Sequence, residues 1–169
     1  SLTIIPGGTL NIDGAAAQGL LNNGTIANGG TINIGSTLNV GAYGLRNNSI
    51  FNNNGGGQLN INKSTNTGLE NTGTFTNLAT INIGNIAGVG LNGILNTSIF
   101  NNNVGGQINI DRSADAGLYN NTGGTFTNLA ILSIGAGFGV GEYGIWNKAT
   151  FNSNGGSQLT INRSTDAAI

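Results

Sequence analysis

The chain has 169 residues, of which 31 are Gly and another 31 are Asn, while only five are Lys or Arg and six are Asp or Glu. It contains no Cys, His or Met, which excludes disulfides, thiolate metal sites and every histidine-based mechanism. A net charge of −1 gives no electrostatic surface for nucleic acid, and no apolar run is long enough to span a membrane. The chain begins without Met or a signal peptide, so we expect a processed chain or an excised fragment.

Low charge and high Gly content are typical of disordered chains, but this chain repeats, which changes the prediction. Three short phrases recur in a fixed order. The first phrase is Gly, then Leu or Ile, then any residue, then Asn. Its Asn positions lie 24 to 27 residues apart, at Asn22, Asn47, Asn71, Asn96, Asn120 and Asn147.

The second phrase is a large apolar residue followed two positions later by Asn, as in Phe51 and Asn53. The third alternates apolar and polar residues, as in Ile81-Asn82-Ile83. Each phrase is too short for a helix, and Gly and Asn cluster between phrases as turns require. Three short strands per turn of about 25 residues predict one coil of a parallel β-helix, in which neighbouring coils cover each other's apolar inner faces.

We predict an all-β fold, a right-handed parallel β-solenoid that forms a single domain over 1–169. It begins with a partial coil over 1–13, continues with six full coils of 22 to 27 residues over 14–162, and ends with a partial coil over 163–169. Long and short coils alternate. Long coils contain a Gly-Gly turn before Gln, at 51–58, 100–107 and 151–158, whereas short coils carry Thr-Phe-Thr-Asn at 74–77 and 125–128.

The Asn of the first phrase has a structural explanation. Its side-chain amide can bond to the same amide one coil away and form a ladder, and Asn tolerates the left-handed conformation where a strand ends in a turn. We therefore predict a structural ladder at these six positions rather than a ligand site.

Two kinds of apparent active-site motif are better explained as turns. Residues 88–93 and 139–144 match the dinucleotide pattern GxGxxG, but a Gly-Ile strand phrase follows each match where a helix would be needed. Asp111, Asp115 and Asp166 recur beside Arg112 or Arg163, which favours local Arg–Asp turn pairs over the converging acids of a glycosidase. We predict no catalytic residue, no metal site and no cofactor, and hence no enzyme.

The outward positions offer two candidate surfaces. The first phrase presents Leu95, Tyr119 and Trp146 in a row, a contact stripe for a glycan or for another protein, or else a surface that a neighbouring loop covers. The third phrase presents a regular polar face of Asn, Ser and Thr. Flat Thr-rich faces of solenoids resemble those of ice-binding proteins, but here Thr-x-Thr occurs only in the second phrase of every other coil, at 74–76 and 125–127.

The two ends suggest self-assembly. Residues 163–169 and 1–13 together number 20, against 22 for the short coil at 63–84, so one molecule's tail and the next one's head could complete a coil and give a filament. The alternatives are a fragment of a longer array, or an N-terminal strand that caps the stack with Pro6 at its edge. The interface predicted for assembly comprises Leu2, Ile4, Leu10, Ile12, Arg163, Thr165, Asp166 and Ile169.

The phrase at 23–34 (NGTIANGGTINI) and the opening phrase at 5–12 (IPGGTLNI) resemble the repeats of bacterial surface and secreted β-helical proteins, of the filamentous-haemagglutinin and autotransporter-passenger kind. The resemblance covers nearly the whole chain. It implies an extracellular or cell-surface location and an adhesive or structural role, and it supplies no catalytic residue. We therefore expect a structural subunit that stacks into a fibre, with a stalk or binding module of a surface adhesin as the alternative. Its partner would be a second copy, or a glycan or host or neighbour-cell protein.

Overall fold

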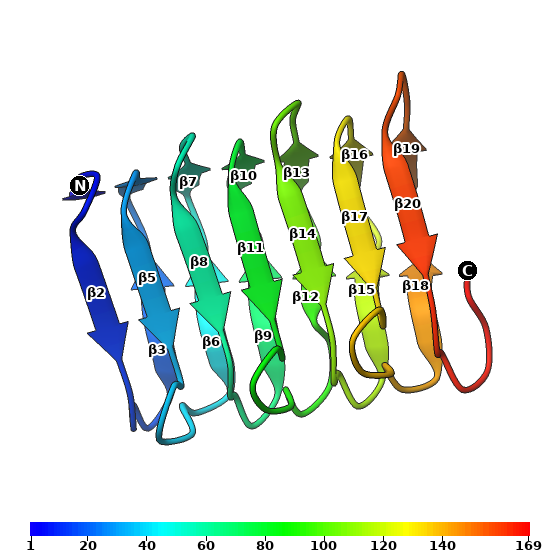
Figure 1. The fold of residues 1–169 in the computed structure, drawn as a ribbon, viewed down its shortest axis with the longest axis horizontal. Helices are drawn as coiled ribbons and strands as arrows, with labels where there is room; N and C mark the ends of the chain where they lie inside the picture. Colours follow the sequence, from blue (N-terminus) through cyan, green and yellow to red (C-terminus); the bar gives the residue numbers. More distant parts are fainter.

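The structure is a computed structural model that describes residues 1–169, and it consists of twenty strands with no helix. The strands form three sheets around one long axis (Figure 1). Sheet A contains β1 (Leu2–Ile4), β4 (Thr25–Asn28), β7 (Ile50–Asn53), β10 (Thr74–Asn77), β13 (Ile99–Asn102), β16 (Thr125–Asn128) and β19 (Thr150–Ser153). Sheet B contains β2 (Thr9–Ile12), β5 (Thr31–Ile34), β8 (Gln58–Ile61), β11 (Thr80–Ile83), β14 (Gln107–Ile110), β17 (Ile131–Ile134) and β20 (Gln158–Ile161). Sheet C contains β3 (Gln18–Asn22), β6 (Tyr43–Asn47), β9 (Thr67–Asn71), β12 (Ile94–Asn96), β15 (Ala116–Asn120) and β18 (Tyr143–Asn147).

The chain visits sheets C, A and B in turn, and each strand pairs in parallel with the strand of the next coil. In Figure 1 the strands of sheet B run downwards at the front and the others run upwards behind, while the chain advances from left to right. That is the sense of a right-handed coil. The predicted fold, a right-handed parallel β-solenoid with three short strands per coil, is therefore confirmed.

The pairing register places similar residues of successive coils next to each other. Phe75 lies opposite Phe51 on one side and Phe100 on the other, and Ile81 lies between Leu59 and Ile108. The Phe rings of successive coils stack with centroids 4.6 to 4.7 Å apart from β7 to β16. A cluster of 24 buried residues runs through the solenoid, so a chain with few apolar residues still obtains a continuous core.

The Gly of the first phrase is required by the packing of sheet C. At Gly68 a Cβ atom would lie 2.7 Å from the carbonyl oxygen of Gly93 in the next coil and 2.7 Å from Cγ2 of Ile83 in sheet B. These distances are too short for any side chain. Gly at this place therefore allows sheets B and C to approach each other closely.

The predicted Asn ladder is also confirmed. From Asn22 to Asn147, each side-chain amide of the first phrase donates to the amide oxygen of the next coil, over 2.7 to 2.9 Å. A second buried ladder ends the strands of sheet A, from Asn28 through Asn128. A third runs in the opposite direction along the outer face of sheet B, where Asn33 donates to Asn11 and Asn109 to Asn82.

Two local predictions were wrong. No Asn occupies the left-handed region: apart from glycines, only Arg112 and Arg163 have positive φ, at 50° and 52°. The Asn residues end their strands in extended conformation and act through their side chains. Nor do Arg112 and Arg163 pair with Asp, because the one ion pair joins Arg46 and Glu70.

The arginines instead reach the loop of the preceding coil. Arg112 donates to the carbonyl oxygens of Gly84 and Asn85, and Arg163 donates to that of Gly137. Asp111 accepts hydrogen bonds from the backbone N–H groups of Gly137 and Phe138. Acid and base therefore bind different loops rather than each other, which sequence spacing alone does not distinguish.

Candidate self-assembly interface and contact stripe

The motifs weighed in the sequence lie at the corners between strands. The residues that match GxGxxG form the corner that precedes β12 and the corner that runs into the first two residues of β18, with no helix after either, so the turn interpretation holds. No three His, Cys, Asp or Glu side chains gather into a group that could hold a metal ion. The structure has no helix long and apolar enough to cross a membrane.

The N-terminal end presents an incompletely covered core. Leu10, Ile12 and Leu20 belong to the inner columns but are only partly buried, because no coil lies beyond them in the structure. Leu2, the first residue of the apolar column of sheet A, lies opposite Ile26 and is 39% exposed. Ile4 lies opposite Asn28 and is buried, so an apolar side chain ends the second Asn ladder.

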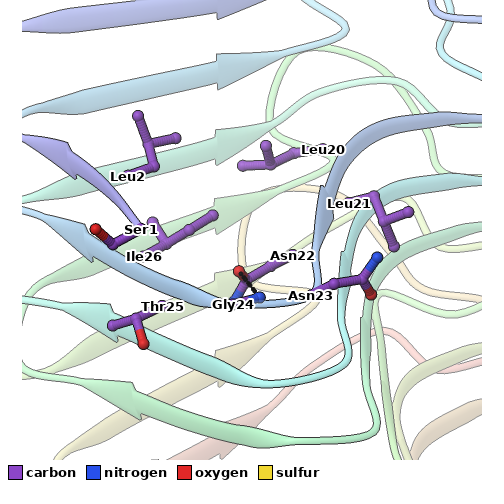
Figure 2. A pocket seen from close by; sticks show the side chains of 9 residues that line it. All are labelled: Ser1, Leu2, Leu20, Leu21, Asn22, Asn23, Gly24, Thr25 and Ile26. Carbon is purple, nitrogen blue, oxygen red and sulfur yellow. Dashed lines mark hydrogen bonds between the residues drawn. The ribbon is translucent and has the colours of Figure 1, made fainter.

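A pocket of about 240 Å³ opens at this end beside the unpaired edge of β3. Figure 2 shows Leu2, Ile26 and Leu20 on its apolar side, and Asn22, whose side chain accepts a hydrogen bond from the N–H of Gly24. The pocket exists because sheet C has six strands whereas sheets A and B each have seven. Sheets A and B begin with β1 and β2, and the matching strand of sheet C is absent beside β3.

The C-terminal end presents the complementary arrangement. Phe151, Leu159 and Ile161 are inner residues that are only partly buried. Beyond β20 the chain returns to sheet C, where the N–H groups of Gly144 and Ile145 donate to the carbonyl oxygens of Ala167 and Ala168. Ile169 follows and is 73% exposed, in the place where earlier coils carry a buried Leu or Ile.

The remaining predicted interface residues lie in the corner that leads to this segment. Thr165 binds the carbonyl oxygen of Gly141 through both its N–H and its hydroxyl group. Asp166 donates its N–H to the carbonyl oxygen of Glu142, and its side chain is exposed. Arg163, Thr165 and Asp166 thus hold the last segment on the preceding coil, while the apolar residues form the open end.

The stripe residues Leu95, Tyr119 and Trp146 lie side by side in register on sheet C, and all are half-buried. The rings of Tyr119 and Trp146 stack on each other with centroids 4.4 Å apart. The Lys148 ammonium lies 4.2 Å from the Trp146 centroid, and the Tyr143 ring lies 5.1 Å away. Much of each ring face is therefore covered by a neighbour, which leaves less face for stacking on a sugar.

The same row continues with Arg46 and Glu70, which form an ion pair with Nε and Oε2 2.7 Å apart. Glu70 is only 8% exposed although it points outward. Burial raises the pKa of Glu70 above its ordinary value, and the Arg46 charge opposes that rise. The row as a whole is a packed side-chain column on the outside of the solenoid, a feature that the sequence reading missed. The sequence signal for this column is that equivalent positions of neighbouring coils carry two aromatic residues, Tyr119 and Trp146, and two opposite charges, Arg46 and Glu70.

Comparisons with protein-family models, with curated proteins and with solved structures found no match to this chain.

Proposed function

We propose that this chain is a non-enzymatic structural protein, a rigid β-solenoid whose two ends stack on copies of itself to form a fibre. The observation that carries the proposal is the fit between the ends. The strand of sheet C that is absent beside β3 has its counterpart in Ala167–Ile169, which lies in sheet C beyond β18. Continued stacking would place Ile169 of one copy over Leu20 of the next.

The other two sheets would continue across the same junction. In the repeating register Phe151 would face Leu2, Leu159 would face Leu10 and Ile161 would face Ile12. Each pair buries two apolar side chains that are partly exposed in the single molecule. The outer ladder would continue too, because the amide of Asn11 would meet the hydroxyl of Thr160. The contact is heterologous and does not close on itself, so it produces a filament.

The tail and head leave a gap in this shared coil. Ile169 corresponds to Leu20 and Ser1 to Thr25, so four residues equivalent to 21–24 have no counterpart. The gap lies at the pocket beside Asn22, so the Asn ladder of sheet C would lack one member at the junction. The junction is therefore weaker at one corner than a coil within the chain, which suits reversible assembly.

The extracellular location follows from the resemblance to bacterial surface and secreted β-helical repeats and is part of the proposal. A composition without Cys, His or Met and with few charges supports a role in stacking rather than in chemistry. The alternative is a stalk or binding module of an adhesin, in which the half-buried Tyr119 and Trp146 side chains on the outside of sheet C would contact the ligand. Binding to a glycan array that disappears in Trp146→Ala would favour that alternative.

Negative-stain microscopy and sedimentation of the purified chain test the fibre. We expect rods that lengthen with concentration, and we expect Ile169→Asp to shorten them to single particles because it buries a charge at the junction. Ile169 is 73% exposed, so this change leaves the fold intact. Ile50→Asp, at a 43% exposed position in the middle of the solenoid, is the matched control and should leave rod length unchanged. Single short particles at high concentration of the unaltered chain would overturn the proposal.

A further inference from the structure

The turn that connects sheet A to sheet B alternates in length from coil to coil. It has four residues in one coil and two in the next, as the strand boundaries show. The four-residue turns are 5–8, 54–57, 103–106 and 154–157, and the two-residue turns are 29–30, 78–79 and 129–130. The upper edge of sheet B, at the top of Figure 1, therefore carries a longer turn on every second coil and a shorter turn between.

The corner that leads from sheet B to sheet C alternates as well, with the opposite phase. It has five residues at 13–17, 62–66, 111–115 and 162–166, and eight at 35–42, 84–91 and 135–142. The second of these loops is taken to end at residue 91, although β12 begins only at Ile94, because Asn92 lies opposite Thr67, the first residue of β9. A coil with a short upper turn thus has a long lower loop. These long loops project below β5, β11 and β17 in Figure 1.

The long lower loops carry exposed apolar side chains. Leu38 is 62% exposed, Ile86 is 63% and Phe138 is 50%. The first and third loops are held from neighbouring coils: Asp13 accepts from the N–H groups of Thr37 and Leu38, and Asp111 from those of Gly137 and Phe138. Arg112 holds the second loop through the carbonyl oxygens of Gly84 and Asn85, and its guanidinium also covers one face of the Phe138 ring. The three tips are therefore presented in fixed positions, two coils or about 9.5 Å apart along the axis.

The upper edge has a hollow at one of its short turns. A pocket of about 280 Å³ lies over Leu129, Ala130 and Ile131, between the projecting turns 103–106 and 154–157. Val104 on one wall is 76% exposed, and Gln107 and Gln158 lie at the rim. Leu78, in the equivalent short turn two coils away, is 39% exposed. The recess at 129–131 and the loop at 135–142 belong to the same coil, at opposite ends of β17.

We propose that the two edges of sheet B dock on each other between parallel, side-by-side copies of this chain. The long lower loops of one copy would lie against the short upper turns of its neighbour, between the longer turns, with Leu38 at 29–30, Ile86 at 78–79 and Phe138 at the pocket over 129–131. Because long loop and short turn share a coil, all three contacts form together without any axial shift. A second copy is the fitting occupant because its long lower loops recur every two coils, as the short upper turns do, and lie on the same coils as those turns.

This lateral contact is separate from the stacking of ends and involves none of its residues. It is heterologous, since each copy offers one edge to each neighbour, so it continues into a flat layer of parallel rods. It also accounts for the strict alternation of long and short coils, which a solenoid that stacks only along its axis does not need.

Cysteine cross-linking tests the contact and its register, because the natural chain has no Cys. Copies with Phe138→Cys are mixed with copies that carry Ile131→Cys in the recess of the same coil. In the control mixture the second copy carries Thr80→Cys, the equivalent position two coils away, since both Ile131 and Thr80 pair with Gln107. Ile131 and Phe138 are exposed, so the changes leave the core intact.

We expect the disulfide between Phe138→Cys and Ile131→Cys copies to form at least about tenfold faster than the control disulfide, because docking raises the effective concentration of the matched pair. The preference should persist in copies that also carry Ile169→Asp, which separates this contact from end-to-end stacking. Equal rates in the two mixtures, or cross-links mainly between two Phe138→Cys copies, would overturn the proposal.

A triple variant supplies a second measurement. Leu38→Ser, Ile86→Ser and Phe138→Ser together should abolish lateral association in sedimentation experiments. Ile50→Thr and Ile99→Thr, at positions 43 and 46% exposed on sheet A, should leave it unchanged. Lateral association that survives the triple variant would contradict the assigned edges.

Discussion

The buried ladder that ends the strands of sheet C and the exposed ladder on the face of sheet B use the same side chain for the same bond. Asn71 donates to Asn96 over 2.9 Å, and Asn82 donates to Asn60 over 2.9 Å. The difference is in what surrounds the amide. Asn71 is fully buried and also donates to the carbonyl oxygens of Gly73 and Ile99, whereas Asn60 remains partly exposed to solvent.

Burial rather than the hydrogen bond itself should decide how much each ladder stabilises the fold. When a buried amide is removed, its partners are left without water to replace it. When an exposed amide is removed, water takes its place at little cost. Two columns of Asn residues that look alike in sequence should therefore contribute different amounts to the free energy of unfolding.

The largest expected effect comes from Asn71→Ala. This change leaves the amide of Asn47, the amide oxygen of Asn96 and the carbonyl oxygen of Ile99 without their partner. We expect the free energy of unfolding to fall by about 3 kcal/mol, measured by denaturant titration. Asn60→Ala is the matched control, with an expected loss of about 0.5 kcal/mol or less. Equal losses for the two variants would show that burial does not separate the ladders.

An intermediate effect is expected where backbone packing beside the ladder leaves no space. Gly68→Ala places a Cβ atom 2.7 Å from the carbonyl oxygen of Gly93 and should cost about 2 kcal/mol through displacement of sheet C. At Gly55, in an exposed turn, the added Cβ meets nothing within 4 Å. Gly55→Ala should therefore change the midpoint of thermal unfolding very little, and a comparable loss there would contradict the steric argument.

The smallest effect concerns Glu70, an outward residue that is nevertheless buried. Because burial raises its folded pKa above the unfolded value, the fold favours the protonated form, and stability is lost as pH rises through the folded pKa. Glu70→Gln removes this loss. The stability of the variant relative to the natural chain should therefore increase between about pH 4 and pH 7.

Denaturant midpoints at the two pH values measure this change, with the exposed Glu142→Gln as control. A difference between Glu70→Gln and the natural chain that stays constant across this range would show that solvent reaches Glu70 as freely as it reaches an ordinary surface carboxylate.

Sequence reasoning predicted the parts of this fold that repeat. Each column of the core, such as Phe51, Phe75 and Phe100, could be read from a phrase that recurs at coil spacing. The buried Asn ladder followed from the same logic, since a residue in register with itself meets its own amide. A repeat therefore reveals contacts between coils, because every coil supplies the same evidence.

The features that sequence reasoning missed depend on contacts that change from coil to coil. Arg112 stands beside Asp111 in the chain, yet the two side chains bind different loops because φ is positive at Arg112. The burial of Glu70 depends on Arg46 and the neighbours in its row. The sequence also contains the alternation of short upper turns with long lower loops. Its use as a docking pattern could be inferred only once the structure placed both sets of turns at the two ends of sheet B.

The spacing of the ladder bonds also bears on how the molecule folds. Every Asn–Asn bond along the three ladders joins residues 22 to 27 positions apart, whatever their place in the chain. The entropy lost in closing one coil is thus nearly the same at each step. Once two coils have formed, each new coil adds to a finished template, so a longer array would meet no harder folding problem than this one.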